Sequence, residues 1–167
     1  MKKKIVIACD KYKGNLSALE VCNIIKDAII QTDKDIETVI HPMADGGEGT
    51  VETLVESYGG ETIEISVSGP ALDKVDAKFG MIDGCTAIIE MSAASGLSLI
   101  PKSRQNPMNT TTFGTGELIS AAIRKGCSKI IIGIGGSATN DAGMGMAQAL
   151  GTKFYDKAGE LLGYGGR

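Results

Sequence analysis

The first forty residues contain two apolar runs separated by an amphipathic stretch. The runs at residues 5–9 and 36–40 are typical of strands buried inside a parallel sheet. Between them, residues 17–29 carry apolar side chains at helical spacing, and Ser17 followed by Glu20 has the pattern of a capping box. The order strand, helix, strand predicts a parallel crossover, so we expect an α/β protein with a Rossmann-like sheet at its N-terminus.

The pattern then predicts one helix followed by several strands. Residues 50–58 have helical spacing, and residues 61–68 alternate in the manner of a strand with one exposed face. Residues 75–81 and 86–91 predict two further strands, joined by an Asp-Gly turn. Strand–strand order has replaced strand–helix order at this point.

This change of order predicts a domain boundary near Ser68. Residues 1–67 are expected to form the N-terminal part of a first α/β domain, and residues 68–167 the beginning of a second. Further along, residues 117–125 predict a helix, and residues 153–155 predict a late strand.

The densest pattern follows a run of isoleucines. Residues 130–132 predict a strand buried on both faces, the small residues among positions 133–138 predict a tight turn, and residues 142–150 predict a helix. A helix that starts after a glycine turn directs free N–H groups and a positive dipole toward one point, which suits a phosphate. The same pattern also fits a plain tight turn before a helix capped by Thr139, Asn140 or Asp141.

Two more polar loops follow the first two predicted strands. Asp10 and Lys13 lie in the first loop, and Asp45 and Glu48 lie in the glycine-rich second loop. Ligands of parallel sheets bind beyond the carboxyl ends of strands, where these loops are expected. Asp45 and Glu48 either cap the next helix, or one of them is a magnesium ligand or the base for a hydroxyl group.

A third polar segment, Thr110–Thr112, precedes the helix predicted at residues 117–125. The hydroxyl groups of Thr111 and Thr112 either bind a phosphate or a substrate hydroxyl, or cap that helix.

Composition narrows the class of protein. The 167 residues include 43% hydrophobic and 22% charged residues, as expected for a globular protein that buries a core. A net charge of -3 and an aromatic content of 4% argue against a nucleic-acid partner. The four scattered cysteines lack zinc spacing and fit reduced thiols in a cytoplasmic protein. No apolar run is long enough to span a membrane, so no membrane partner is expected.

Two known phosphate-binding motifs were compared with the glycine turn. The Walker pattern is absent, whereas the dinucleotide pattern G-x-G-x-x-G/A matches at Gly133, Gly135 and Ala138. A dinucleotide-binding oxidoreductase is therefore one alternative. Its motif normally follows the first strand of a domain, and here several strands precede it. Asp141 would also repel the phosphate unless a metal ion lay between them.

Four blocks of sequence, in order along the chain, resemble the glycerate kinase family of the bacterial two-domain type. The blocks are Asp10–Ala18 (DKYKGNLSA), Met43–Thr50 (MADGGEGT), Thr110–Ile119 (TTTFGTGELI) and Gly133–Asp141 (GIGGSATND). The resemblance implies two α/β domains, one inserted into the other, and phosphorylation of D-glycerate by ATP with Mg²⁺, usually to 2-phosphoglycerate. Family members are longer, so the chain is expected to be an N-terminal portion that is truncated, and an inactive kinase fragment is the second alternative.

The resemblance also implies roles for the polar residues of these blocks. The residues expected to contact ATP are Gly135, Gly136, Ser137, Asn140, Thr111 and Thr112. The residues expected to act in catalysis are Asp10, Lys13, Asp45, Glu48 and Asp141. Among them, Asp45 and Asp141 are expected to hold Mg²⁺, either Asp45 or Glu48 to accept the hydroxyl proton, and Lys13, oriented by Asp10, to pair with the glycerate carboxylate or a phosphate.

The chain departs from the family pattern at three positions in these loops. Cys9 stands where proline is common, Lys11 where serine is common, and Ala142 where glycine is common. Because Lys11 replaces a hydroxyl group, no hydroxyl contact is expected from that position.

Overall fold

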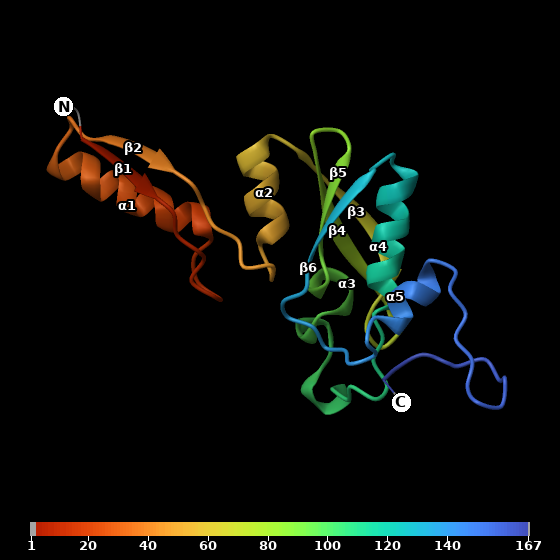
Figure 1. Ribbon diagram of the computed structural model, residues 1–167. Helices are drawn as coiled ribbons and strands as arrows, with labels where there is room; N and C mark the ends of the chain where they lie inside the picture. The colour runs from red at the N-terminus through yellow and green to blue at the C-terminus, as the bar shows by residue number, and fades with distance from the viewer. Residues whose placement is uncertain (1–2, 167) are drawn as a thin grey trace.

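A computed structural model describes residues 3–166 and shows two groups of elements (Figure 1). The first group lies to one side of the others and consists of β1 (Lys4–Ile7), α1 (Ala18–Thr32) and β2 (Glu37–Ile40). β1 and β2 are parallel neighbours, in register from Lys4↔Glu37 to Ile7↔Ile40. The parallel crossover predicted at the N-terminus is therefore confirmed.

Helix α1 begins where its capping box predicts. The Ser17 hydroxyl accepts the backbone N–H of Glu20 at 3.2 Å, and the Glu20 carboxylate accepts the N–H of Ser17 at 2.8 Å. These reciprocal bonds satisfy donors that have no partner inside the helix. The buried stripe of α1 packs on β1, where Cys22 Sγ lies 3.8 Å from the Ile7 carbonyl oxygen.

The second group contains a four-stranded sheet. Its strands, in spatial order, are β3 (Glu61–Ser68), β4 (Lys74–Ile82), β5 (Thr86–Glu90) and β6 (Lys129–Gly133). The β3–β4 and β4–β5 pairs are antiparallel, and the β5–β6 pair is parallel. The helices of this group are α2 (Thr50–Tyr58), α3 (Ser92–Ser95), α4 (Phe113–Arg124) and α5 (Met144–Ala149), with 3-10 turns at residues 97–99 and 102–104. Parallel strand pairs joined through helices confirm the α/β class.

Helices α2 and α4 cover opposite faces of this sheet. Ala77 and Phe79 of β4 belong to a buried cluster that includes α4 residues. Gly80, the next residue of the strand, faces α2, because a Cβ built on it would lie 3.3 Å from Val51 Cγ1. Successive residues of a strand point to opposite faces, so the two helices sandwich the sheet.

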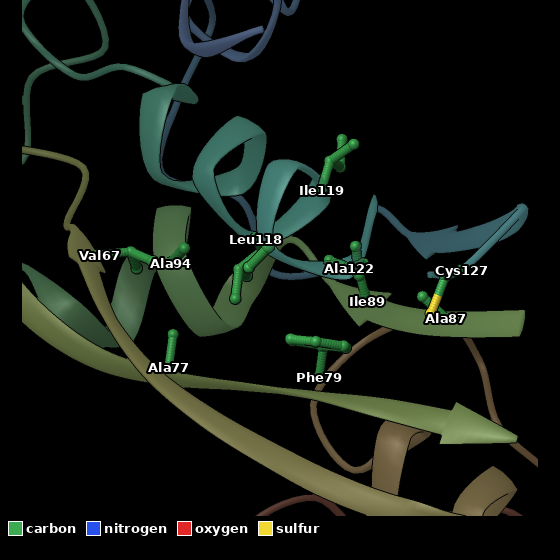
Figure 2. Packing of buried hydrophobic residues seen from close by; sticks show 11 residues of the cluster. Val67, Ala77, Phe79, Ala87, Ile89, Ala94, Leu118, Ile119, Ala122 and Cys127 are labelled. Atoms are coloured by element: carbon green, nitrogen blue, oxygen red, sulfur yellow. The ribbon is translucent and has the colours of Figure 1, made fainter. Parts of the chain in front are cut away.

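The cluster between the sheet and α4 is the main core of the second group (Figure 2). Phe79 of β4 lies below Leu118 of α4, Ile89 of β5 lies to one side, and all three are fully buried. Burying an apolar side chain of this size contributes roughly 1.5–3 kcal/mol to folding. The core therefore holds β5 and its neighbours firmly and fixes the loops that leave the sheet at the carboxyl ends of β5 and β6.

Strand β6 is confirmed, but the prediction that it is buried on both faces is wrong. Ile131 is 41% exposed, and Ile130 and Ile132 are only partly buried. Within residues 3–166, β6 pairs with β5 alone and forms an edge of the sheet. An apolar run indicates that a segment favours a strand, but it does not specify how many other strands pair with it.

The strand predicted at residues 153–155 is also wrong. This segment is mostly exposed, and Tyr155 makes only an isolated bridge to Leu161. The domain boundary near Ser68 stays a prediction, although β3 and β4, which lie on either side of it, pair from Glu61↔Met81 to Ser68↔Lys74. The two sheets are separated in sequence by residues 41–49 and α2 instead.

Candidate functional site

Three loops that are distant in sequence line one cavity of about 470 Å³. Residues 11–17 follow β1, residues 45–49 precede α2, and residues 135–136 follow β6. The residues of this cavity that the sequence predicted as functional are Lys13, Asp45, Glu48, Gly135 and Gly136. The tertiary structure thus brings one part of the predicted site together.

The loops before α2 and after β6 meet through their glycines. The Gly135 N–H donates to the Gly46 carbonyl oxygen at 2.9 Å. A Cβ on Gly135 would lie 2.8 Å from Gly47 Cα, and a Cβ on Gly133 would overlap the Gly46 carbonyl oxygen. Side chains at these positions would force the two backbones apart. The glycines of both motifs therefore first serve to let the loops touch.

The turn at Gly135–Ser137 leaves two backbone donors open. On either side, Leu97 donates to the Gly136 carbonyl oxygen and Ala138 donates to the Ser95 carbonyl oxygen, both at 2.9 Å. Between these anchors, the N–H groups of Gly136 and Ser137 have no acceptor among the residues that the structure describes. Gly136 has a φ of +74° and lines the cavity. Two successive open N–H groups in such a turn form a favourable site for an anion.

Two lysines from the first loop approach Asp45 across the cavity. Lys11 Nζ lies 2.7 Å from Asp45 Oδ1, and Lys13 Nζ lies 3.8 Å from Asp45 Oδ2. The hydrogen bond from Lys11, followed by that from the Gly47 backbone, lowers the pKa of Asp45 from 3.8 to about 2. Lys11 was not among the predicted site residues. Its position beside Lys13 in a polar loop after a strand was the one signal that could have indicated it.

We expect that replacing Lys11 with methionine will return the pKa of Asp45 from about 2 toward 3.8. A depressed folded-state pKa contributes stability above the unfolded pKa, and this contribution is lost as the pH falls through the folded pKa. The unfolding free energy of the wild type should therefore fall between pH 3.8 and about 2 more than that of Lys11→Met. Titration of the Asp45 carboxyl by NMR measures the shift.

The matched control for this measurement is Lys13→Met. The Lys13 side chain is 80% exposed and lies farther from the carboxylate, so solvent screens its effect. A smaller shift than in Lys11→Met is expected. Equal shifts in the two variants would contradict the ranking of the two lysines.

The remaining predicted residues of the first two loops lie at the rim. Glu48 is exposed, and within residues 3–166 its carboxylate has no hydrogen bond or ion pair. Asp10 lines a neighbouring cavity of about 350 Å³, which also includes Glu48 and Gly49, and its Oδ1 accepts the Lys11 N–H at 2.7 Å. The alternative in which Asp45 and Glu48 cap α2 is wrong, because Gly49 is the N-cap and the cap makes no side-chain bond.

Asp141 lies in a second, buried group of polar residues outside the cavity lining. It is 6% exposed, and its carboxylate accepts the Thr112 backbone N–H at 2.8 Å and the Thr112 hydroxyl at 2.9 Å. The same carboxylate accepts the Gly143 and Gly145 N–H groups at 3.1 Å each, and the Thr111 hydroxyl at 3.3 Å. Asp141 therefore caps the first turn of α5 and ties it to the segment before α4.

The threonines of this group are equally enclosed. Thr111 and Thr112 are 0% and 1% exposed, and Thr112 Oγ1 also accepts the N–H of Met146 at 2.9 Å. Thr112 is the N-cap of α4 without a side-chain cap bond, whereas Thr111 Oγ1 accepts the N–H of Phe113, the first residue of α4, at 3.2 Å. Ser137 Oγ bonds Thr139 Oγ1 at 2.8 Å inside its own turn, and Asn140 is exposed outside the cavity lining. The nucleotide-binding roles of these side chains stay predictions that their present contacts do not support.

Ala142, which follows Asp141, has a φ of +51°. This left-handed conformation favours glycine, so an alanine here is strained. Alanine in place of the family's common glycine at this position therefore costs conformational free energy.

A magnesium ion held jointly by Asp45 and Asp141 does not fit the donors found here. The carboxylate of Asp141 is buried under five amide and hydroxyl hydrogen-bond donors, and Asp45 already faces two ammonium groups. In the part of the chain that the structure describes, no three His, Cys, Asp or Glu side chains gather to hold a metal ion. The predicted pair of metal ligands is thus not supported by the geometry.

Comparisons with known proteins all indicate the same family. A model of the Glycerate kinase family matches residues 5–167. The glycerate kinase of Haemophilus influenzae and the glycerate 2-kinase of Escherichia coli K12 are each 51% identical to this chain over 164 residues, covering 98% of this chain. A crystal structure described as a glycerate kinase 2 from Salmonella typhimurium LT2 matches with a TM-score of 0.89 and 48% identity over 99% of this chain.

These matches cover only part of the relatives. The chain spans 43% of the length of the two enzymes and 44% of the solved chain.

Within residues 3–166, no helix is long and apolar enough to cross a membrane.

Proposed function

The chain belongs to the glycerate kinase family, and from that premise we propose that it provides the phosphate-binding and substrate-binding loops of an ATP-dependent kinase that phosphorylates D-glycerate to 2-phosphoglycerate. The observation that carries this proposal is the cavity that Gly135 and Gly136 line together with Lys11 and Lys13, next to the open N–H groups of Gly136 and Ser137. Both walls of the cavity favour negative charge, as ATP and a small carboxylic acid require.

The two walls suit different parts of the reactants. The backbone donors of Gly136 and Ser137 match phosphate oxygens, which accept several hydrogen bonds at once. Lys13 is 80% exposed at the cavity and is available to pair with the carboxylate of D-glycerate. Lys11 is already held by Asp45 at 2.7 Å, so it keeps the cavity positive without being the mobile partner.

Glu48 is the better candidate of the two loop carboxylates to accept the hydroxyl proton. Asp45, with a pKa of about 2 and two ammonium neighbours, is a weak base. Glu48 lines the same cavity, is exposed, and has no charged partner within residues 3–166. In this proposal Asp45 orders the lysines, and Glu48 acts on the substrate hydroxyl. In phosphoryl transfer, magnesium neutralises charge on the nucleotide phosphates when it is bound.

The oxidoreductase alternative depends on the same glycines and is less favoured. Gly133 and Gly135 approach the backbone of Gly46 and Gly47, so their open side is taken by the neighbouring loop. A dinucleotide fold also needs an acidic residue on the ribose after the next strand, and Asp156 is the candidate by position. Asp156 instead lies in a turn where its Oδ1 accepts the N–H groups of Ala158 and Glu160. The inactive kinase fragment is a separate alternative, because the chain spans less than half of the length of its relatives.

The test is D-glycerate-dependent release of ADP from ATP by the 167-residue chain, with calorimetric titration of ATP and of NAD. We expect turnover in the wild type, and at least about a tenfold increase in the KM for D-glycerate in Lys13→Ala, since a lost charge-assisted contact is worth about 1.5–3 kcal/mol. Lys34→Ala, which removes an exposed lysine outside the cavity, should behave as the wild type.

The three outcomes of this test separate the three functions. Turnover that depends on D-glycerate supports the kinase. ATP binding without turnover supports the inactive fragment, and saturable NAD binding without ATP binding supports the oxidoreductase.

A further inference from the structure

Glu90 is a buried carboxylate for which the proposed reaction has no role. It is the last residue of β5 and is 5% exposed. Its Oε1 accepts the backbone N–H of Val51 at 2.7 Å. Burial raises the pKa of Glu90, against the effect of this bond. Burying a carboxylate costs free energy, and buried polar groups are normally hydrogen-bonded. The hydrogen bond that Glu90 makes therefore indicates why it is buried.

The hydrogen bond to Glu90 replaces a side-chain cap that is missing at the N-terminus of α2. The N-cap of α2 is Gly49, which has a φ of +90° and no side chain to bond the first-turn N–H groups. Those groups need acceptors, and the positive end of the helix favours an anion. Glu90 reaches them from a strand that lies 39 residues further along the chain. It therefore caps α2 from the sheet.

The same carboxylate lies directly beneath one wall of the candidate site. Residues 45–49 run into α2, and they carry Asp45 and Glu48 into the cavity. At one end this loop is fixed by the bond from Gly135 to the Gly46 carbonyl oxygen. At the other end, the bond from the Val51 N–H to Glu90 fixes the first turn of α2, into which the loop runs. β5 and β6 are paired neighbours, so one rigid sheet edge holds both ends.

We propose that Glu90 is a positioning residue, which holds the 45–49 loop in place through the N-terminus of α2 and so sets the position of Glu48 in the cavity. Its importance for turnover rests on the proposed function, but its effect on the loop does not. Glu90 also borders a neighbouring cavity of about 380 Å³ that includes Glu48 and Glu64. Glu64 is exposed and makes no hydrogen bond or ion pair within residues 3–166, so it provides a matched control.

The first experiment measures amide hydrogen exchange in the wild type, Glu90→Gln, Glu90→Ala and Glu64→Gln. In Glu90→Ala, exchange at Val51 should be at least tenfold faster, while amides of α4 keep their wild-type rates. Glu90→Gln retains one acceptor oxygen and should give a smaller change at the same amide. Glu64→Gln should leave it unchanged. Unchanged exchange at Val51 in Glu90→Ala, or an equal increase throughout α4, would overturn the proposal.

The second experiment separates positioning from simple loss of stability. At a temperature where all variants are folded, Glu90→Ala should lower kcat with D-glycerate at least tenfold, Glu90→Gln should lower it less, and both should leave the KM for ATP within threefold of the wild type. The KM for ATP should change little because the N–H groups of Gly136 and Ser137, the proposed phosphate donors, make no bond to Glu90. A rise in the KM for ATP with kcat unchanged would count against positioning of Glu48. If the wild type shows no turnover, the proposed function fails, and the exchange measurement alone decides the role of Glu90.

Discussion

Replacement of Asp141 with alanine is expected to lower the free energy of unfolding by about 3–5 kcal/mol, as for other buried charges whose hydrogen-bonded partners are left behind. The variant would leave the backbone N–H groups of Thr112, Gly143 and Gly145 without their acceptor. Thr112 and Gly145 are buried and Gly143 is half-buried, so water cannot fully replace the lost acceptor. Urea denaturation followed by far-ultraviolet circular dichroism measures the loss.

Two further variants make this result specific. Asp141→Asn keeps one oxygen acceptor and should lose less stability than Asp141→Ala. Asp27→Ala removes an exposed carboxylate from α1 and should stay within about 0.5 kcal/mol of the wild type, as is usual for surface changes. If Asp141→Ala unfolds at the wild-type urea concentration, the carboxylate is not a structural link, and the predicted role as a magnesium ligand becomes the better explanation of this residue.

Replacement of Gly133 with alanine is expected to cost about 1–3 kcal/mol of stability, the usual effect of overpacking, and to weaken ATP binding. The new Cβ would overlap the carbonyl oxygen of Gly46, which is backbone and has no rotamer through which to move aside. The clash would separate the two glycine loops and with them the turn at Gly136 from the lysine wall of the cavity. Urea denaturation and calorimetric titration with ATP test both parts of the expectation.

Gly163→Ala is the control for Gly133→Ala. A Cβ on Gly163 would meet nothing within 4 Å, and neither glycine has a positive φ. The two variants therefore differ in contact alone and not in backbone strain. Wild-type stability and ATP affinity in Gly133→Ala would contradict the view that contact between the loops assembles the cavity.

If Asp141 and Gly133 behave as expected, the residues of the two glycine-rich motifs have different tasks. Asp141 and its threonine partners hold α5 to the segment before α4, and the glycines let two loops meet. The groups left for a ligand at the cavity are Lys13, Glu48 and the open N–H of Gly136, with the open N–H of Ser137 next to it. The proposed kinase site is therefore smaller than the set of polar residues in its motifs.

The local elements and the family were determined by the sequence itself. The capping box of Ser17 and Glu20 defines the start of α1, and the alternation of residues 61–68 predicts β3 with its observed bounds. Both depend on residues that are close in the chain, where helix capping and side-chain periodicity act directly. The family could be recognised because four motif blocks occur in order, and the match to residues 5–167 confirms it.

The tertiary structure alone decided which polar residues face a ligand. Asp45 and Asp141 occur in similar glycine-rich loops, yet one meets two lysines at a cavity and the other is buried against threonines about thirty residues away in sequence. Glu90 looked like an ordinary end of an apolar strand, and Ile131 looked fully buried. A sequence records what each residue prefers, but the partner of a carboxylate and the neighbour of a strand depend on contacts between distant segments. Those contacts are fixed only when the sheet and its two covering helices have packed together.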